Sequence, residues 1–317
     1  MGSWSYDKTE FAEWLNHRRH KHHERFELVV WDDTGYRIPW ELLWVPSKRR
    51  SGLPSGYLGA LVTVTRWVKM KPYWPEQVRP FTNPNPYRAS GPVVAYVASD
   101  MTEDWTVLRD FDVERAAGMD ELLAILGGDP DPLAMVYVAC HGEFDDDHPG
   151  DSKLGGVPLG RMSRYNDDFP RLSEQSTLVV LNGCRTGSIG VDAGKYNDGA
   201  LSGFAAVFLR CGASGVLATT GAVGMEEARK VADTLFKQLR LEADRSVPDA
   251  IRRLRADAAV AIDQLLRSYE SVEERAAADA ALRPLLNPFM YVYFGSPRMV
   301  MSLVPNGGIA ETAVTGG

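Results

Sequence analysis

The stretch LVVLNGCRTG (178–187) decides the fold class of this chain. Its apolar run ends in a cysteine, Cys184, that is held between glycines. A second apolar run, VYVACHG (136–142), ends in the same way and places His141 before a glycine. Short apolar runs without alternation are typical of strands that are buried on both faces, as in a parallel sheet. We therefore expect two buried strands that carry a histidine and a cysteine to one rim.

Other short runs rich in β-branched residues alternate along the chain with longer helical patterns. The further strands are expected at ELVVW (27–31), ALVTVTRW (60–67), VVAYVAS (93–99) and SGVLATT (214–220). Helices are expected at 112–126, 200–210, 225–243 and 248–270, with another that begins near Lys8. This alternation predicts an α/β fold with a mostly parallel central sheet and helices on both faces. In such a sheet the ligand crevice lies outside the carboxyl ends of the strands, where both the histidine and the cysteine stand.

The three cysteines differ in their surroundings. Cys140 precedes His141, so strand alternation turns its side chain to the opposite face and into the packing of the sheet. Cys211 lies in FLRCGASGV (208–216), where a helix ends and a strand begins, without a polar neighbour that would activate it. We interpret both as small hydrophobic packing residues. Cys184, in its glycine-bounded turn, is the candidate nucleophile.

The histidines sort in the same way. Four of the six crowd into HRRHKHH (17–23), which we interpret as a solvated helix face, because these histidines lack carboxylate or cysteine companions at metal-site spacing. His148 stands in a polar, turn-rich stretch that is typical of an exposed loop. His141 remains as the partner of Cys184. A histidine and a cysteine on one rim have the layout of a hydrolase in which an imidazole takes the thiol proton and the thiolate attacks a carbonyl.

Several motifs together resemble the CHAT proteases, which belong with the caspases and separases among the caspase-like cysteine peptidases. The histidine precedes the cysteine in the chain, as in that group. The segments similar to the family, which span about residues 28 to 300, are DDTGYRIPWELL (32–43), GYLGALVTVTRWV (56–68), VYVACHGEFDDDHPGDSKLGGVPL (136–159), LVVLNGCRTG, DGALSGFAAVFLRCGASGVLAT (198–219) and NPFMYVYFGSP (287–297). The resemblance implies a caspase-like fold, a His141–Cys184 dyad and cleavage of one dedicated protein. It also implies control by a partner, a sensor domain or oligomerisation in a bacterial defence or signalling pathway.

In the expected mechanism His141 accepts the thiol proton, and the backbone N–H groups of Gly142 and Cys184 hold the oxyanion. No metal or organic cofactor is required. Some caspase-like relatives that cut after basic residues carry an aspartate two positions before the cysteine, and Asn182 stands there in this chain. An amide supplies no charge, so no preference for basic residues follows.

We name Asn182, Glu143, Asp147 and Asp192 as candidate substrate-binding residues. The last three belong to two acidic groups, Glu143 with Asp145–Asp147 and Asp192 with Asp198, that form either a wall for the substrate or a solvated loop.

The chain is expected to divide into four parts. These are an N-terminal helical segment (1–27), a β-rich subdomain with a proline-rich connection (28–92), the caspase-like core (93–304) and a flexible tail (305–317). The prolines at 72, 75, 80, 84, 86 and 92 mark the connection.

Composition is typical of a globular chain: 44% of the 317 residues are hydrophobic and 24% are charged. The formal net charge of −7 disfavours nucleic acid as the main partner. Three cysteines make no disulfide framework, and no apolar run is long enough to span a membrane, so we expect a cytoplasmic protein. A noncatalytic interaction module and a hydrolase or acyltransferase acting on a small molecule stay open as alternatives to a protease.

Overall fold

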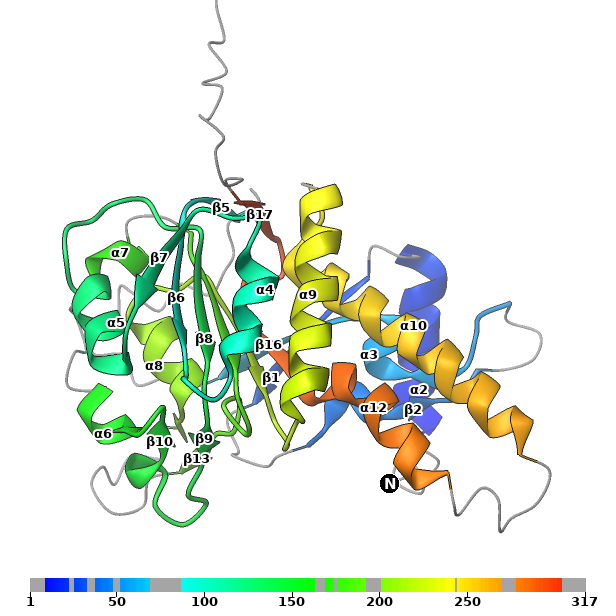
Figure 1. The fold of residues 1–317 in the computed structure, drawn as a ribbon. Coiled ribbons are helices and arrows are strands. Elements are labelled where there is room, and N and C mark those ends of the chain that lie inside the picture. Colours follow the sequence, from blue (N-terminus) through cyan, green and yellow to red (C-terminus); the bar gives the residue numbers. More distant parts are fainter. Residues whose placement is uncertain are drawn as a thin grey trace, which may run out of the picture.

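The structure is a computed structural model that describes residues 9–22, 26–32, 38–47, 52–68, 87–162, 169–173, 176–191, 201–242, 244–269 and 278–303. Within these residues an eight-stranded sheet forms the centre of the molecule, in the order β1-β4-β16-β15-β12-β8-β6-β7 (Figure 1). The strands are β1 (Glu27–Asp32), β4 (Thr63–Val68), β16 (Tyr291–Gly295), β15 (Gly215–Thr219), β12 (Leu178–Asn182), β8 (Met135–Ala139), β6 (Val93–Val97) and β7 (Val113–Ala116).

Every neighbouring pair in the sheet is parallel except one, so the predicted mostly parallel sheet is confirmed. The exception is β15–β16, which is antiparallel. The strands from β15 to β7 therefore run one way, and β16, β4 and β1 run the other way. β8, β12 and β15 are buried along their whole length, which explains why their sequences are apolar without alternation.

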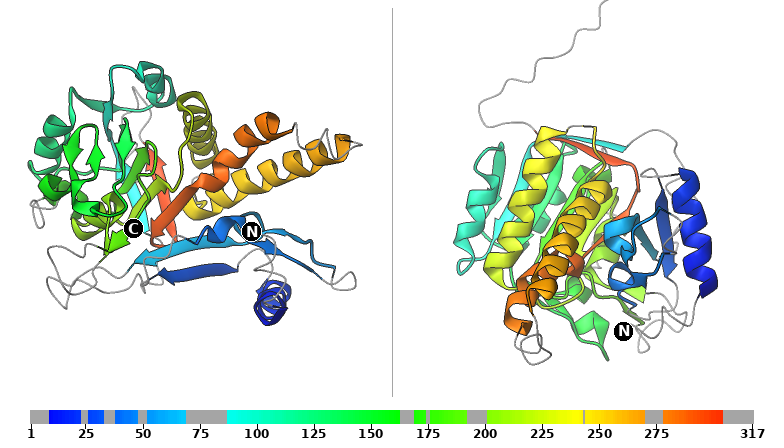
Figure 2. Two further views of the ribbon diagram at one scale, coloured as in Figure 1. Left: turned by 90° about the horizontal axis from the view of Figure 1, so that it is seen from below. Right: turned by 90° about the vertical axis from the view of Figure 1, so that its right-hand side faces the viewer.

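Helices cover both faces of the sheet, as predicted (Figures 1 and 2). Alternate residues of each strand face opposite sides, so Val179 packs with one layer and Val180 with the other. The first layer contains α5 (Met119–Leu126) and α8 (Phe204–Arg210). The second contains α4 (Trp105–Leu108), α9 (Met225–Leu241) and α10 (Val247–Ser268). Both layers are closed by aliphatic and aromatic side chains, which supply the main hydrophobic stabilisation.

Further helices, turns and strands complete the described fold. They are α2 (Thr9–His22), α3 (Leu58–Leu61), α6 (Leu159–Met162), α7 (Pro170–Ser173), α12 (Asp279–Met290), the 3-10 turns η2 (Trp40–Leu42), η3 (Thr102–Asp104) and η4 (Pro149–Asp151), and the paired strands β2 (Trp44–Val45) with β3 (Gly56–Tyr57), β5 (Tyr87–Gly91) with β17 (Met299–Leu303), β9 (Gly142–Glu143) with β10 (Lys153–Leu154) and β11 (Val157–Pro158), and β13 (Gly190–Val191) with β14 (Leu201–Ser202).

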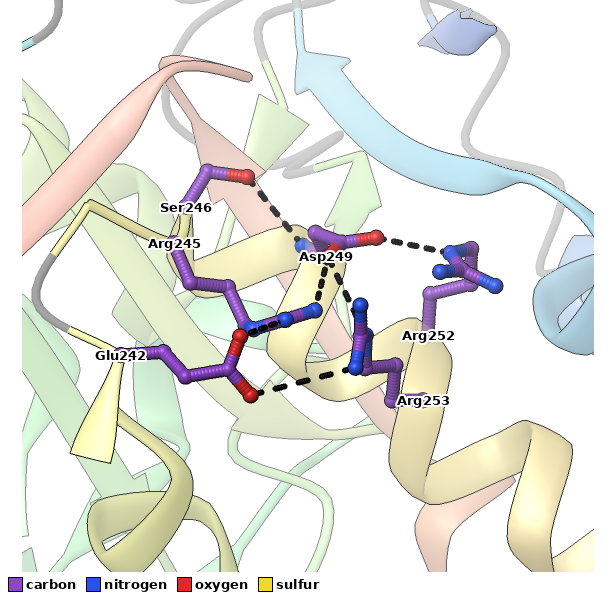
Figure 3. Close-up of polar contacts among 6 residues, drawn as sticks. All are labelled: Glu242, Arg245, Ser246, Asp249, Arg252 and Arg253. Atoms are coloured by element: carbon purple, nitrogen blue, oxygen red, sulfur yellow. Dashed lines mark hydrogen bonds and ion pairs between the residues drawn. The ribbon is translucent and has the colours of Figure 1, made fainter. Parts of the chain in front are cut away.

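The junction of α9 and α10 is fixed by ion pairs (Figure 3). Ser246 caps α10 by accepting a hydrogen bond from the Asp249 N–H. Arg245, whose side chain is only 9% exposed, lies between the carboxylates of Glu242 and Asp249. Arg252 pairs with Asp249, and Arg253 lies within ion-pair distance of both Glu242 and Asp249. This cluster holds the turn that sends α10 back across the sheet.

One predicted helix is wrong in its first half. Residues 112–126 do not form one helix, because Val113–Ala116 form the edge strand β7 and the helix begins only at Met119. β7 pairs with β6 on one side only, so it carries a mixed pattern of exposed and buried residues instead of an apolar run. Gly118 then provides the extended N-cap of α5.

The N-terminal elements share the central sheet with the core. β1 and β4, from the predicted 28–92 subdomain, extend the sheet beyond β16, and α2 and α3 pack on one of its faces. The helix expected near Lys8 is α2, and most of its basic side chains are exposed. Arg19 is the exception: it is 5% exposed and donates to the Asn16 side chain and the Pro54 carbonyl.

The remaining domain boundaries stay predictions. Most of the proline-rich connection and the tail from residue 304 lie outside the described residues. No helix in the described part of the chain combines the length and apolarity that crossing a bilayer needs.

A buried ion cluster joins the N-terminal elements to the C-terminal ones. Glu41, 1% exposed, accepts hydrogen bonds from Arg66 at 3.1 and 2.5 Å. Arg255, also 1% exposed, donates to the carbonyls of Pro288 and Tyr291 where α12 meets β16. Burial alone would raise the pKa of Glu41, but the guanidinium groups of Arg66 and Arg255 lower it overall, so this carboxyl is ionised. Burial lowers the pKa of Arg255 to about 10, which leaves it charged at neutral pH.

Glu41→Gln is expected to destabilise the fold by about 3 kcal/mol or more, because it leaves two guanidinium groups buried without a counter-charge. Urea unfolding followed by tryptophan fluorescence measures this loss. Lys237→Ala is the matched control, because it removes an exposed pair with Asp233 within α9 and should cost less than about 1 kcal/mol. Equal stability of Glu41→Gln and the parent would contradict the assigned role of the cluster.

Candidate active site

His141 and Cys184 lie at the carboxyl ends of two adjacent parallel strands. β8 and β12 pair in register from Leu178 with Met135 to Asn182 with Ala139. The chain continues from β8 into His141 after one residue and from β12 into Cys184 after one residue. The structure therefore brings the two segments to one edge of the sheet, as the sequence predicts.

The two segments touch through their backbones at two glycines. A methyl group on Gly142 would overlap the carbonyl oxygen of Cys184, and one on Gly183 would overlap the carbonyl oxygen of Cys140. Only glycine fits where two backbones approach this closely. The same close approach of the two backbones thus explains why glycine follows the histidine and why glycine precedes the cysteine.

The turn that carries Cys184 is braced from β15. The Gly187 N–H donates to the Thr219 carbonyl at 2.7 Å, and the Arg185 N–H donates to the Gly221 carbonyl at 3.0 Å. The hydroxyl of Thr186 donates to the Leu181 carbonyl at 2.9 Å and accepts the Thr219 N–H at 3.1 Å. Arg185 itself has a φ of 55°, a left-handed conformation that a tight turn imposes at a cost.

The side chains of the two candidate residues bond to other groups in this structure. The Cys184 thiol is half-buried and donates to the Val223 carbonyl at 3.6 Å. The His141 Nε2 lies 2.6 Å from a carboxylate oxygen of Asp100. No hydrogen bond between the imidazole and the thiol occurs among the described residues. With Nε2 bound to Asp100, Nδ1 is the ring nitrogen left to act as a base.

Asp100 is a site residue that sequence reasoning missed. It follows β6, the strand next to β8, so it stands at the same edge as His141. The hydrogen bond from His141 lowers the pKa of Asp100 and keeps its carboxyl ionised. The signal was present in VVAYVASD (93–100), an apolar run that ends in an acid at the rim of the predicted sheet.

The other two cysteines are packing residues, as predicted. Cys140 is fully buried and Cys211 is 5% exposed, and both belong to the hydrophobic layer that contains α5 and α8. Burial raises the pKa of Cys140 to about 12, so its thiol stays protonated.

Asn182 lies beneath the site in a buried polar network. Its amide donates to Asp104 at 3.0 Å and to the Tyr137 hydroxyl at 2.9 Å, and its oxygen accepts from the Tyr291 hydroxyl at 2.5 Å. Burial raises the pKa of Asp104. Asn182 is only 3% exposed. A substrate would reach it only by displacing one of these partners, so its role as a substrate contact stays a prediction.

The acidic residues after His141 fall into different settings. Glu143 and Asp147 are exposed and remain available to a ligand. Asp145 instead accepts the N–H groups of Asp147 and His148, which shapes the loop. Asp192 and Asp198 lie outside the described residues.

Asp146 of the acidic loop forms an ion pair with Arg185. Arg185 is a second residue that sequence reasoning missed. Arg185 also donates to the Phe144 carbonyl at 3.2 Å, so it ties the histidine loop to the cysteine turn. Within the described part of the chain, no three histidine, cysteine or acidic side chains are grouped as a metal site would require.

Gly183→Ala is expected to destabilise the protein by about 2 kcal/mol, because the new methyl group meets a backbone carbonyl that cannot move aside without shifting β8. The temperature of thermal unfolding should fall, and the alkylation rate of Cys184 should differ from that of the parent. Gly118→Ala is the control, since nothing lies within 4 Å of its added methyl group and only the helix cap is affected. A Gly183→Ala variant with parental stability and reactivity would refute the packing argument.

Comparison with known proteins finds no match among curated sequences. Among solved structures, a Saccharomyces cerevisiae separase–securin complex is 14% identical with a TM-score of 0.49, and covers 84% of this chain and 15% of that chain. The chain therefore spans only a small part of that relative.

The Arg-specific cysteine proteinase gingipain R is 9% identical with a TM-score of 0.50, over 94% of this chain and 69% of that one. A complex of the Porphyromonas gingivalis RgpB pro- and mature domains is 11% identical with a TM-score of 0.47, over 95% and 73%. At these identities the likeness to gingipain R shows a common caspase-like fold. The CHAT domain family matches residues 94–272, more than half of the chain and the whole span from β6 to beyond α10. The chain belongs to the CHAT domain family.

Proposed function

We propose that this protein is a cysteine endopeptidase in which Cys184 is the nucleophile and His141 is the general base. The observation that carries the proposal is the pair of glycine contacts that hold the histidine and cysteine segments backbone to backbone at one sheet edge. Such an arrangement fixes the two backbone segments relative to each other and so limits how far apart the two side chains can lie. The CHAT family match agrees with this chemistry.

In the proposed reaction His141 takes the thiol proton through Nδ1, and the thiolate attacks a peptide carbonyl carbon. The developing oxyanion is stabilised by the backbone N–H groups of Gly142 and Cys184. The described residues include no acceptor for the Cys184 N–H, which leaves that donor available. The imidazolium then protonates the leaving amine, and water hydrolyses the thioester to release the second product.

Asp100 is a positioning residue in this scheme. Its carboxylate fixes Nε2 as the protonated ring nitrogen and stabilises the imidazolium that forms during catalysis. The tie between Arg185 and Asp146 keeps the histidine loop beside the cysteine turn while the substrate is bound.

The resting contacts favour control of activity. The thiol must leave the Val223 carbonyl before the imidazole can take its proton. We therefore expect a partner protein, a sensor domain or oligomerisation to raise the activity, and a dedicated protein to be the substrate. An interaction module without hydrolysis is the alternative that the first experiment addresses.

Labelling with a library of electrophilic peptide ketones tests the dyad. The parent protein is expected to be labelled on Cys184, and labelling should disappear in Cys184→Ala and in His141→Ala. Cys211→Ala is the control, because its buried thiol lies away from the site and labelling should persist. A folded parent protein that stays unlabelled even with candidate partners added would favour the interaction module.

Asp100→Asn tests the positioning role. Its neutral amide cannot stabilise the imidazolium, so labelling should slow at least about tenfold while the fold is kept, because Asp100 is exposed.

In the parent, the His141 hydrogen bond holds the pKa of Asp100 below its ordinary value, so the carboxylate persists to lower pH. His141→Ala should raise that pKa toward its ordinary value, measured by NMR titration of the carboxyl carbon. An unchanged titration would mean that the two side chains do not interact in solution.

A further inference from the structure

A cavity of about 350 Å³ lies beside the candidate nucleophile. One side is formed by the loop after β15 and the start of α9, and the other by α12, whose place next to α9 is visible in Figure 1. The loop side contributes Ala222, Gly224 and Glu227. The α12 side contributes Arg283, Pro284, Leu286, Asn287 and Met290, with Ala280.

The cavity and the thiol share one short segment of backbone. Val223, whose carbonyl accepts the hydrogen bond from the Cys184 thiol, stands between two lining residues, Ala222 and Gly224. Consecutive Cα atoms are only about 3.8 Å apart, so the loop side of the cavity lies within a residue or two of the carbonyl that the thiol contacts. A side chain adjacent to the cleaved bond can therefore enter the cavity.

The wall combines an apolar surface with two charged groups. Leu286, Pro284 and Met290 supply the apolar part. Glu227 lies in the first turn of α9 with its carboxylate against Gly224, where the N–H groups of the helix end stabilise a negative charge. The negative charge of Glu227 is thus stabilised by the amino end of its own helix.

Arg283 is in the opposite situation. It lies in the first half of α12, where the helix dipole gives a cation no support. None of the ion pairs and hydrogen bonds between described side chains includes it. It is exposed and lines the cavity, so its guanidinium is the charged group that a ligand can still pair with.

We propose that this cavity is a substrate subsite for an acidic side chain, with Arg283 as the specificity-determining residue. The inference rests on the proposed peptidase function and adds the class of residue that is recognised near the cleaved bond. A glutamate fits the site best, because its methylene groups can lie along Leu286 and Met290 while its carboxylate forms a two-point pair with the guanidinium. A lysine ammonium at the same position would be repelled by the Arg283 guanidinium.

Two readouts test the subsite and the function separately. The first is the cleavage of a proteome-derived peptide library, read by mass spectrometry, for the parent, Arg283→Glu and Arg109→Glu. Arg109 is the matched control, because it is 70% exposed at the C-cap of α4 and does not line the cavity. The second is binding of fluorescent peptide pools, with glutamate or lysine at fixed positions, to the Cys184→Ala variant with and without Arg283→Glu.

In the parent and in Arg109→Glu, acidic residues should be enriched at one position close to the cleaved bond. Arg283→Glu should reduce that enrichment about tenfold, as expected for one charge-assisted pair, and should favour lysine there. Cleavage without an acidic preference, or a preference that survives in Arg283→Glu, overturns the subsite and leaves the peptidase function standing.

If the parent cleaves nothing, the proposed function fails and the binding readout decides on the subsite. Stronger binding of the glutamate pool, reversed by Arg283→Glu, would support an acidic site without hydrolysis. Equal binding of the two pools would overturn it.

Discussion

The site depends on one steric constraint, the contact of two backbones where β8 and β12 leave the sheet. At Gly142 and Gly183 each segment occupies the space where the other would place a Cβ atom. Parallel pairing of the two strands sets the direction of the segments, and the glycines set how closely they approach. The hydrogen bonds of Thr186 and the ion pair of Arg185 brace the same turn from β15 and from the histidine loop.

The C-terminal part of the chain also supports the cysteine turn, through hydrogen bonds to the end of β12 and to the loop after β15. Tyr291, the first residue of β16, donates to the amide of Asn182, and the Met290 carbonyl accepts both the N–H and the hydroxyl of Thr220. Arg255 donates a hydrogen bond to the Tyr291 carbonyl at the same junction, and its positive charge interacts with the Glu41 carboxylate. Polar groups that are buried and fully bonded have one favourable arrangement, which makes this support rigid.

The sequence was sufficient for the parts of the fold that depend on local pattern. The apolar runs at β8, β12 and β15 predicted buried parallel strands, and the glycines beside His141 and Cys184 predicted turns at one edge. The edge strand β7 was mistaken for helix, because an edge strand has no obligatory apolar pattern and its residues also suit a helix. α12 was not predicted, since Pro284 and Pro288 lie inside it and break the usual helical signature.

The pairing of side chains across the site could not be derived from the sequence. Asp100, Arg185 and Asp146 are polar residues in loops, and nothing in their spacing says which of the neighbouring charges each will meet. Asn182 was named as a candidate substrate-binding residue, and it stands two positions before the cysteine. Its burial follows from Tyr137 and Tyr291, which come from two other strands, and only the assembled sheet shows that these hydroxyls converge on one amide.

The reversed direction of β16 has a consequence for how such a molecule can diversify. Because β16 runs against β15, its amino end lies at the same edge as the carboxyl ends of β6, β8, β12 and β15. The helix that precedes it, α12, therefore ends at the edge of the sheet that carries His141 and Cys184, although it is not part of the strands that position them. Changes along the outer face of α12 can alter the border of the site while the sheet and its glycine contacts stay intact. Because of this one antiparallel strand, the outer face of α12 can vary while the strands that position His141 and Cys184 stay unchanged.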